Sequence, residues 1–528
     1  MITTSNKRRR FRMIIPAYPA LNIYSFSARR TTALGPVCIA TVVNKTAGWD
    51  AEVIDENNLR RHGPVGEAKG ADHVLLQEQR PADIIGLYGG LTSTIPRLYE
   101  IASFYTDRGI ITIAGGQHFS EETIPEALSS GVDYAVIGEG EETIKELLES
   151  LEGKRDIQSV KGIAYLKDGN VVYTQARAPI TDFDTLPLPD FSLVRYAKII
   201  NYPVERIRGC GMDCEFCTVK GTPRNASPER LLERISFLVE TRGAKKFFIV
   251  DDLFGQHRND TIRFCNMIRD YQKNIGKRLS LGVQIRLDKA RDTALLCAMK
   301  EANIKSVFIG LESPIGAELT AMKKRLKPED MIALTRIFHK FGFFIHGMFI
   351  FGYPLEKGAA VPMQAAERIR HYRRFIKKAK LDTIQVLMPV PLPGTKLRDR
   401  LKEGNRLYST EDVGWEYYDG NFPLFEPDRP MTAEDMQFSA WKIMKKFYEF
   451  KNLFMICLSV FSFTGMIFFL HNIKGGWKRW HRYWHNYLVR FSGWVILRKW
   501  KTASGRVIFA QKLCKAKKHL SPASKFTT

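Results

Sequence analysis

Short apolar runs alternate with helical stretches through the first 150 residues. Five of these runs are short and largely apolar, as strands buried on both faces are, and they lie at 11–18, 51–55, 83–88, 110–114 and 134–137. The segments between them, such as 96–108 and 141–151, carry apolar residues at helical spacing. The pattern predicts a doubly wound, Rossmann-like α/β domain over residues 1–152.

The pattern changes after this domain. Between 157 and 194, short alternating segments surround the turn Lys167-Asp168-Gly169-Asn170, and the Pro-rich run DTLPLPDF follows. Turn residues between alternating segments are typical of a hairpin. We therefore expect a hairpin and linker over residues 153–195.

A second α/β series follows. Its expected strands lie at 204–208, 246–250, 279–285, 306–311, 344–351 and 383–388, with helical segments between them. Six such steps are too few for a closed eight-fold barrel. The series predicts a partial (β/α)6 TIM-like barrel, open on one side, over residues 196–395.

The rest of the chain divides into an accessory segment, 396–450, and an α-helical, apolar and basic tail, 451–528. Leu453 to Leu470 form 18 residues without a charge. A helix of this length would measure about 27 Å, at the lower edge of what spans a bilayer. Its Ser, Thr and Gly residues fit a buried or interfacial helix equally well.

Charge is concentrated in this tail. Residues 451–528 hold 15 Lys or Arg and no Asp or Glu, so they contribute most of the formal net charge of +24. Residues 477–501 hold five of the eight tryptophans, interleaved with basic residues. This mixture favours a membrane interface. Nucleic acid is the alternative partner, but the adjoining apolar segment argues against it.

The cysteines and the start of the chain indicate the compartment. Eight cysteines are too few and too unevenly placed for a disulfide scaffold. The basic start is followed by a short apolar run that two prolines interrupt, which does not fit a cleaved signal peptide. We expect a cytoplasmic protein that associates with the inner face of the membrane.

Three cysteines stand close together in RIRGCGMDCEFCTVK. Cys210, Cys214 and Cys217 have the spacing C-x3-C-x2-C directly after an expected strand. Three thiolates on one loop can bind three irons of a cubane cluster and leave the fourth iron open. Zinc is one alternative, although it normally takes four ligands with paired spacings. Chance clustering of buried cysteines is another.

This triplet, with Phe216 before its last cysteine, resembles the signature of the radical S-adenosylmethionine superfamily. The resemblance implies a 4Fe-4S cluster as the metal centre, with Cys210, Cys214 and Cys217 as its ligands. It also implies that S-adenosylmethionine binds the open iron and is cleaved reductively to a 5′-deoxyadenosyl radical. Phe216 would then lie near the adenine.

Further cofactor contacts follow from the same resemblance. Asp251 and Asp252 in FFIVDDLFG match the region that binds the methionyl amino group, although two glycines are usual there. Arg286 would meet the carboxylate, Glu312 in FIGLES the ribose, and Gly352 in FIFGYP the adenosyl group. A charged side chain at a strand end is also often only solvated or ion paired.

The first domain resembles the cobalamin-binding domain of a subgroup that includes anaerobic magnesium-protoporphyrin ester cyclases and hopanoid methylases. The likeness rests on AEVIDENN, AGGQHFSEETIPEAL and YAVIGEGEET. Glycines after the third and fourth strands would let cobalamin approach the backbone closely, at Gly89, Gly90, Gly115 and Gly116.

One departure from the commonest cobalamin domains concerns the cobalt ligand. The motif D-x-H-x-x-G is absent, so cobalamin would bind without a histidine on cobalt. The alternative is a relic domain that binds nothing. His118 is expected to be exposed at a strand end, where it contacts a ligand or merely caps a loop.

Together these features predict an enzyme that functionalises an unactivated carbon of a hydrophobic or lipid substrate. Cobalamin-dependent C-methylation is preferred, and oxidative cyclisation or carbon–carbon bond formation without methyl transfer is the alternative. A non-catalytic iron–sulfur sensor at the membrane is a third reading. The electron donor would be of flavodoxin or ferredoxin type. Catalytic residues are not identified, although Tyr353, Tyr417 and Tyr418 are candidate hydrogen donors or packing residues.

Overall fold

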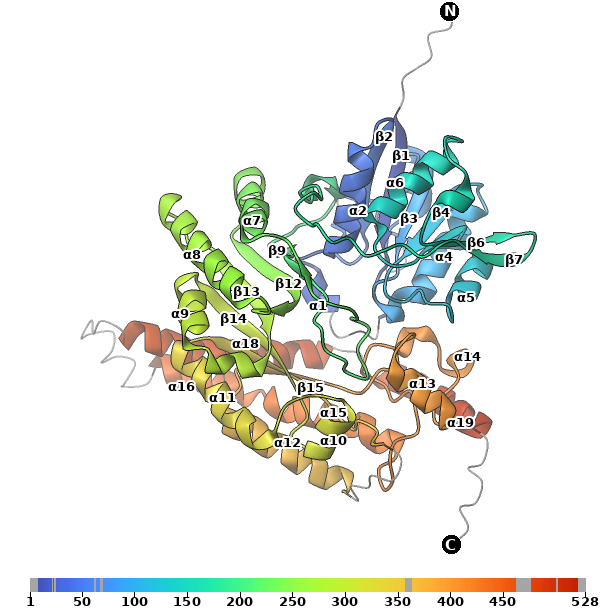
Figure 1. Ribbon diagram of the computed structural model, residues 1–528. Coiled ribbons are helices and arrows are strands. Elements are labelled where there is room, and N and C mark those ends of the chain that lie inside the picture. Colours follow the sequence, from blue (N-terminus) through green and yellow to red (C-terminus); the bar gives the residue numbers. More distant parts are fainter. Residues whose placement is uncertain are drawn as a thin grey trace, which may run out of the picture.

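Two sheets of mainly parallel strands organise the chain (Figure 1). The computed structural model describes residues 8–20, 22, 25–60, 63–66, 70–356, 363–461, 476–499 and 502–520. The first sheet has eight strands in the order β7-β6-β5-β4-β3-β1-β2-β8. Its parallel centre consists of β1 (Arg9–Ile15), β2 (Trp49–Asp55), β3 (Ile84–Tyr88), β4 (Ile111–Gly115) and β5 (Tyr134–Val136). The predicted doubly wound α/β domain is confirmed.

Helices cover this sheet as the periodicity predicts. They are α1 (Ser25–Ala28), α2 (Leu34–Lys45), α3 (His73–Gln79), α4 (Ile95–Thr106), α5 (Ile124–Ser129) and α6 (Gly140–Leu151). Their apolar faces pack on strands that are buried nearly throughout, so the strands carry apolar residues at consecutive positions.

The expected hairpin belongs to the first sheet. β6 (Ile163–Lys167) and β7 (Asn170–Tyr173) pair antiparallel, and β6 continues the sheet beside β5. β8 (Val194–Arg195) joins the opposite edge, parallel to β2. The segment between the two main domains is therefore partly sheet.

The second sheet is a six-stranded parallel partial barrel, as predicted. Its order is β16-β15-β14-β13-β12-β9, formed by β9 (Asn201–Val204), β12 (Lys246–Phe254), β13 (Ser280–Ile285), β14 (Ile304–Glu312), β15 (Phe344–Ile350) and β16 (Thr383–Leu387). Its helices are α7 (Pro228–Arg242), α8 (Arg258–Asn274), α9 (Thr293–Glu301), α10 (Gly316–Ala321), α11 (Pro328–Phe341) and α12 (Ala365–Ala379).

The first barrel strand ends earlier than its apolar pattern suggests. It covers 201–204 and not 204–208, while β10 (Ile207–Arg208) pairs antiparallel with β11 (Arg224–Asn225). The Asp251 carboxylate accepts hydrogen bonds from the backbone N–H groups of Arg206 and Ile207, at 2.5 and 2.9 Å. These bonds take the place of sheet partners, so the chain leaves the barrel.

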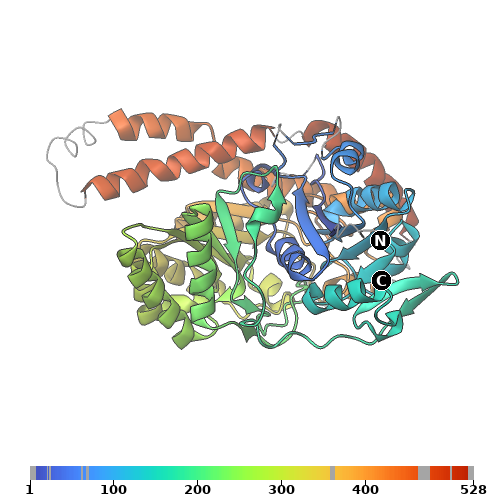
Figure 2. The same ribbon diagram turned by 90° about the horizontal axis from the view of Figure 1, so that it is seen from above.

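The C-terminal region is helical. It comprises α13 (Lys396–Glu403), α14 (Thr410–Val413), α15 (Ala433–Phe447), α16 (Lys451–Phe461), α18 (Gly476–Lys499) and α19 (Thr502–His519). Seen from above, α16 and α18 lie side by side and extend away from the barrel (Figure 2). Among the described residues, none of the helices is both long and apolar enough to cross a bilayer. Residues 462–470 of the predicted apolar segment lie outside the described residues.

Side chains from this region cover the free edge of the barrel. Tyr448 Oη accepts a hydrogen bond from the backbone N–H of Ile384 in β16 and donates one to its carbonyl, at 2.9 and 2.7 Å. Arg490 of α18 donates to the carbonyls of Leu381 and Asp382. The last strand therefore has hydrogen-bond partners on its outer side without another strand.

A buried ion pair ties the first sheet to α3. Arg12 and Glu52 are both fully buried, and Arg12 Nε donates to Glu52 Oε1 at 2.8 Å. The same guanidinium donates to Tyr105 Oη and to the Leu76 carbonyl. Arg80 supplies a second cation to Glu52 at 2.7 Å. Each charge depends on its partners, because an uncompensated buried charge is costly.

Replacing this arginine tests that dependence. We expect Arg12→Met to lower the free energy of unfolding of the first domain by about 3 kcal/mol, the lower end of what breaking a buried ion pair costs, because Glu52 loses its buried cation and keeps only the partly exposed Arg80. Arg10→Met is the matched control: it removes a partly exposed ion pair with Asp50, which contributes about 0–1 kcal/mol. Chemical denaturation monitored by circular dichroism measures both. Equal losses in the two variants would contradict the expectation.

Candidate functional site

The three cysteines line one cavity of about 430 Å³ at the carboxyl ends of the barrel strands. Cys210, Cys214 and Cys217 follow β10. Burial raises the pKa of the Cys214 and Cys217 thiols, so metal binding must displace their protons. Within the described part of the chain, no three His, Cys, Asp or Glu side chains converge as the ligands of a single metal ion do.

The cysteine loop is fixed to α13 by charged side chains. Glu215, between the second and third cysteines, accepts two hydrogen bonds from Arg400, at 2.5 and 2.8 Å. Tyr353 Oη donates to the same carboxylate at 2.6 Å. Lys396 pairs with Asp213 on the loop surface at 2.6 Å. Tyr353, a candidate hydrogen donor, thus has a positioning contact with the loop.

Four of the predicted S-adenosylmethionine contacts lie around the same cavity: Phe216, Asp252, Arg286 and Glu312. Glu312 forms an ion pair with Lys324 at 2.6 Å. Arg286 donates to Asp288 at 2.9 Å and lies 2.9 Å from Met212 Sδ. Positive and negative groups therefore gather at one end of the cavity.

Two other predicted contacts lie elsewhere. Asp251 is buried, points to the backbone before the cysteine loop and is absent from the cavity lining. Gly352 has a φ of +77°, and an added Cβ would come within 2.8 Å of Met436 Sδ on α15. Its lack of a side chain therefore serves packing against α15.

Much of the rest of the cavity lining forms an apolar wall. It is formed by the ends of β13, β15 and β16 and by the segment after β16, and its apolar members include Ile285, Met348, Ile350, Leu387, Met388, Val390 and Leu392. Gln284 and Gln385 add uncharged amides, and Arg325 a cation. One cavity thus joins a charged end near the thiols to an apolar wall.

A second cavity, of about 310 Å³, lies at the carboxyl edge of the first sheet. Gly115, Gly116 and Gln117 line it after β4, and Glu139, Gly140 and Glu141 line it after β5. Glu205 and Arg208, from the segment leading to the cysteine loop, close its other side. The cavity therefore lies between the two domains.

The predicted glycine pairs differ in what they contact. An added Cβ at Gly116 would come within 2.4 Å of the Gly89 backbone, and one at Gly89 within 2.4 Å of the Phe119 ring. An added Cβ at Gly90 would meet the ring of Tyr88. Gly89 and Gly90 thus serve close packing of the two loops and are not part of the cavity lining, whereas Gly115 and Gly116 are.

His118 is buried, so its predicted exposure is wrong. Its ring packs edge-on against Trp415, with 4.9 Å between centroids, and only 1% of the residue is exposed. Burial, with a smaller contribution from Arg398, lowers its pKa to about 3. Its Nε2 is buried without a hydrogen-bond partner, as are Ser93 Oγ and Ser120 Oγ on the neighbouring loops.

The remaining candidate tyrosines are packing residues. Tyr417 contacts the rings of Phe422 and Phe509, and Tyr418 contacts the ring of Trp415. Both are buried and neither lines the cavity at the thiols.

Several site residues were missed from the sequence. Lys324 stands in the basic run KKRLK, which resembles a solvated surface segment. Glu215 and Arg400 are far apart along the chain, so nothing local marks their pairing. Glu139 and Glu141 lie within the quoted segment YAVIGEGEET, where a run of acidic residues at a helix start is common.

Comparison with known proteins defines the class. The B12 binding domain family matches residues 27–148. OxsB, solved as a cobalamin-dependent S-adenosylmethionine radical enzyme with aqua-cobalamin bound, superposes with a TM-score of 0.62 and 15% identity over 98% of this chain and 84% of its own. TsrM of Kitasatospora setae, a radical S-adenosylmethionine methyltransferase with cobalamin and a [4Fe-4S] cluster bound, gives 0.60 and 16% over 75% and 78%. The chain combines a B12 binding domain with the barrel fold of these proteins.

Proteins related in sequence have names that fit the same resemblance. An uncharacterized methyltransferase of Pyrococcus horikoshii is 27% identical over 79% of this chain and 86% of its own length. The hopanoid C-2 methylase of Rhodopseudomonas palustris is 25% identical over 43% of this chain and 42% of its own. The predicted resemblance to cobalamin-domain radical S-adenosylmethionine proteins is confirmed, and so is the prediction that the chain is an enzyme.

Burial of His118 makes stability depend on pH. Its pKa is about 3 in the folded chain and about 6.5 when unfolded, so the unfolded state binds the extra proton between these values. Stability therefore falls as the pH drops from 6.5 toward 3, by about 1.4 kcal/mol per unit.

We expect the melting temperature of His118→Phe to fall less between pH 7.5 and pH 4.5 than the melting temperature of the wild type. Differential scanning calorimetry measures the difference. His371→Phe, at an exposed histidine on α12, should leave the acid dependence unchanged. An acid dependence in His118→Phe as steep as that of the wild type would refute this assignment.

Proposed function

We propose that the chain is a radical S-adenosylmethionine enzyme that functionalises an unactivated carbon of a hydrophobic substrate, with cobalamin-dependent C-methylation as the preferred reaction. The observation that carries this proposal is a single cavity that joins three thiols, a charged end and an apolar wall. The second cavity, next to the segment that leads to the cysteine loop, supports the choice of methylation.

The thiols fit a 4Fe-4S cluster. Cys210, Cys214 and Cys217 would bind three irons through soft sulfur ligands and leave one iron free. When bound, the cluster supplies the electron that cleaves S-adenosylmethionine to a 5′-deoxyadenosyl radical, and cobalamin supplies the methyl carrier. The contacts of Glu215 with Arg400 and Tyr353 hold the loop in place for this ligation.

The charged end of the cavity fits the polar parts of S-adenosylmethionine. Arg286 would bind the methionyl carboxylate as a charge-assisted donor. Glu312, held by Lys324 at 2.6 Å, would accept hydrogen bonds from the ribose hydroxyls, and Asp252 would face the amino group. Phe216 offers its ring to the adenine.

The substrate binds on the apolar wall. Met348, Ile350 and Leu387 would contact its hydrocarbon part, since burial of apolar surface is the main source of binding free energy at such a wall. Gln284 and Gln385 supply hydrogen bonds without charge. This composition favours an isoprenoid lipid or a tetrapyrrole over a charged metabolite.

Cobalamin would bind at the carboxyl edge of the first sheet. Gly115 and Gly116 expose backbone to the cavity there, and the unpaired polar atoms of Ser93, His118 and Ser120 lie on the loops at the same edge. His118 is neutral and buried, and it does not stand in a D-x-H-x-x-G motif, so it would not ligate cobalt. The corrin would therefore be held without a histidine ligand. Oxidative cyclisation remains the alternative reaction if no cobalamin binds.

The C-terminal helices fit a membrane surface. Phe450, Phe454, Leu458 and Leu488 are exposed by 41–63%. Of the side chains described on α16 and α18, only Asn452 is buried, so the described apolar side chains of this pair are at most partly covered by protein. The tail carries basic and no acidic residues, which complements anionic lipid. The chain would thus work at the inner face of the membrane, with electrons from a flavodoxin or ferredoxin.

Anaerobic reconstitution tests the reaction. We expect the chain to bind four irons and cobalamin and to form 5′-deoxyadenosine from S-adenosylmethionine under a strong reductant. Changing Cys210, Cys214 and Cys217 together to Ala should lower bound iron by at least about tenfold and abolish 5′-deoxyadenosine, because the cluster loses its ligands. Changing the exposed Cys297 to Ala is the control and should alter neither.

The outcomes separate the alternatives. A cluster and 5′-deoxyadenosine without bound cobalamin would exclude methylation and favour cyclisation. A cluster without 5′-deoxyadenosine would favour an iron–sulfur sensor. Full iron content in the triple variant would overturn the proposal.

Vesicle flotation tests the membrane surface. We expect the full chain to float with vesicles containing anionic lipid and to bind about tenfold less after Leu458→Ser, since burying one leucine contributes about 1.5–3 kcal/mol. Leu166→Ser, at an equally exposed leucine in the β6–β7 hairpin, is the control. Equal binding by all three proteins would rule out α16 as the contact.

A further inference from the structure

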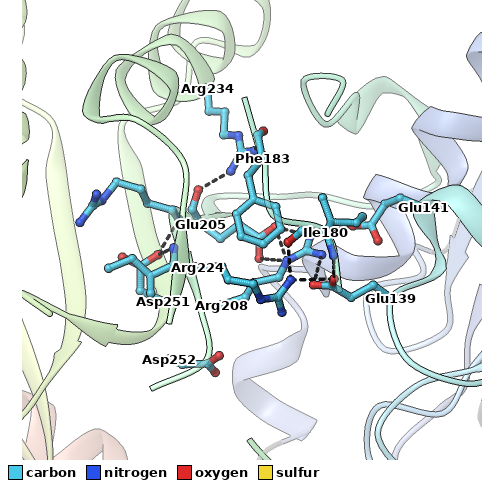
Figure 3. Close-up of polar contacts among 12 residues, drawn as sticks. Glu139, Glu141, Ile180, Phe183, Glu205, Arg208, Arg224, Arg234, Asp251 and Asp252 are labelled. Carbon is cyan, nitrogen blue, oxygen red and sulfur yellow. Dashed lines mark hydrogen bonds and ion pairs between the residues drawn. The ribbon is translucent and has the colours of Figure 1, made fainter. Parts of the chain in front are cut away.

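Arg208, two residues before Cys210, connects the cysteine loop to the first domain (Figure 3). Its guanidinium donates to Glu141 at 2.7 Å and to Glu139 at 3.1 Å, both at the start of α6. It also donates to Glu205 at 2.6 Å. One side chain thus joins two carboxylates of the first domain to the strand that precedes the cysteines.

A second arginine strengthens the connection. Arg224 faces Arg208 across the β10–β11 pair and donates to Glu139 at 2.8 Å. The Phe183 ring contacts both guanidinium groups, at 4.9 and 5.4 Å from its centroid. These contacts restrict the position of Arg208 from the side of the linker.

The barrel holds the same segment from the other side. Asp251 accepts from the backbone N–H groups of Arg206 and Ile207, and Asp252 accepts from that of Gly209 at 2.6 Å. The backbone before Cys210 is therefore fixed between two domains. A small movement of the Asp251–Asp252 pair or of the Glu139–Glu141 pair would therefore shift the backbone next to Cys210.

The far end of the cysteine loop has its own contact with the first domain. Thr218, directly after Cys217, donates from Oγ1 to Gln117 Oε1 at 3.1 Å. Gln117 follows Gly115-Gly116, and it lines the 310 Å³ cavity together with Glu139, Glu141 and Arg208. The cavity wall thus includes the contact residues for both ends of the loop.

We propose that Arg208 is a positioning residue that couples occupancy of this cavity to the cluster on the cysteine loop. The inference rests on the proposed function, because it requires cobalamin in the cavity and a cluster on the thiols. A corrin carries amide side chains that donate to carboxylates, so its binding would compete for Glu139 and Glu141 and shift the Arg208 contacts. Cluster spectra respond to such changes in charge and hydrogen bonding around the sulfur ligands.

The coupling must be reciprocal. If cobalamin changes the affinity for S-adenosylmethionine by some factor, then S-adenosylmethionine changes the affinity for cobalamin by the same factor. Two independent titrations of the reconstituted full chain therefore measure one quantity. Couplings of this kind are typically about five- to 150-fold.

The experiment uses the anaerobically reconstituted full chain with aqua-cobalamin and S-adenosylmethionine as probes. In the wild type we expect aqua-cobalamin to alter the electron paramagnetic resonance spectrum of the reduced cluster and to change the S-adenosylmethionine Kd by about fivefold or more. In Arg208→Gln both ligands still bind, but the spectrum no longer responds and the Kd changes by less than about twofold. Arg208→Lys keeps the charge and should restore part of the response.

Two further variants complete the test. Arg269→Gln removes a partly exposed arginine of α8 that pairs with Asp270 and Glu301, and it should keep the full coupling. Thr218→Val removes the hydrogen bond to Gln117 and changes no charge, so we expect it to reduce the coupling. This variant keeps the inference testable if Arg208→Gln does not fold.

The failures are distinguishable. A wild type that binds both ligands without any coupling overturns this inference and leaves the proposed function standing. Coupling of wild-type size in a folded Arg208→Gln variant also overturns it, and if that variant does not fold, coupling of wild-type size in Thr218→Val does so. A chain that binds no cobalamin or no cluster overturns the proposed function, and this inference with it.

Discussion

The geometry of parallel sheets is the constraint on which the molecule depends. All strands of a parallel sheet end at one edge, so loops that carry polar residues gather there while the strands stay apolar. This chain has two such sheets, and the cysteine loop lies between their carboxyl edges with Asp251 and Asp252 on one side and Glu139 and Glu141 on the other. Both cavities follow from this arrangement: the first is lined by residues at the barrel edge and the cysteine loop, and the second by the edge of the first sheet together with Glu205 and Arg208.

Much of this fold follows from local pattern. Strands buried on both faces are largely apolar, which is why all five central strands of the first sheet and five of the six barrel strands were located from the sequence. The errors have long-range causes. The end of β9 is set by Asp251, which lies in a strand more than forty positions later. His118 was expected to be exposed because nothing in its own segment covers it; Trp415, almost three hundred positions later, does.

The residues of the site likewise fall into those that the local sequence predicts and those that depend on distant parts of the chain. The cysteine spacing is local and marks the cluster loop by itself, and Phe216, Arg286 and Glu312 follow from their order along the barrel. Lys324 could not be found, because its role depends on a loop folding back to within 2.6 Å of Glu312. Gly89, Gly90 and Gly352 are predicted cofactor contacts, and at each of them the neighbour that an added Cβ would meet is a protein side chain.

The capping of β16 by Tyr448 and Arg490 has a consequence for self-association. An uncapped parallel edge strand is a template for pairing with a strand of another copy, and natural proteins cover or charge such edges. Here the cover comes from the same C-terminal region that carries the exposed apolar helices. Proteolytic loss of the tail, residues 451–528, would remove Arg490 and the two apolar helices but leave Tyr448 on β16, so the barrel edge would be opened only in part to intermolecular β-sheet formation.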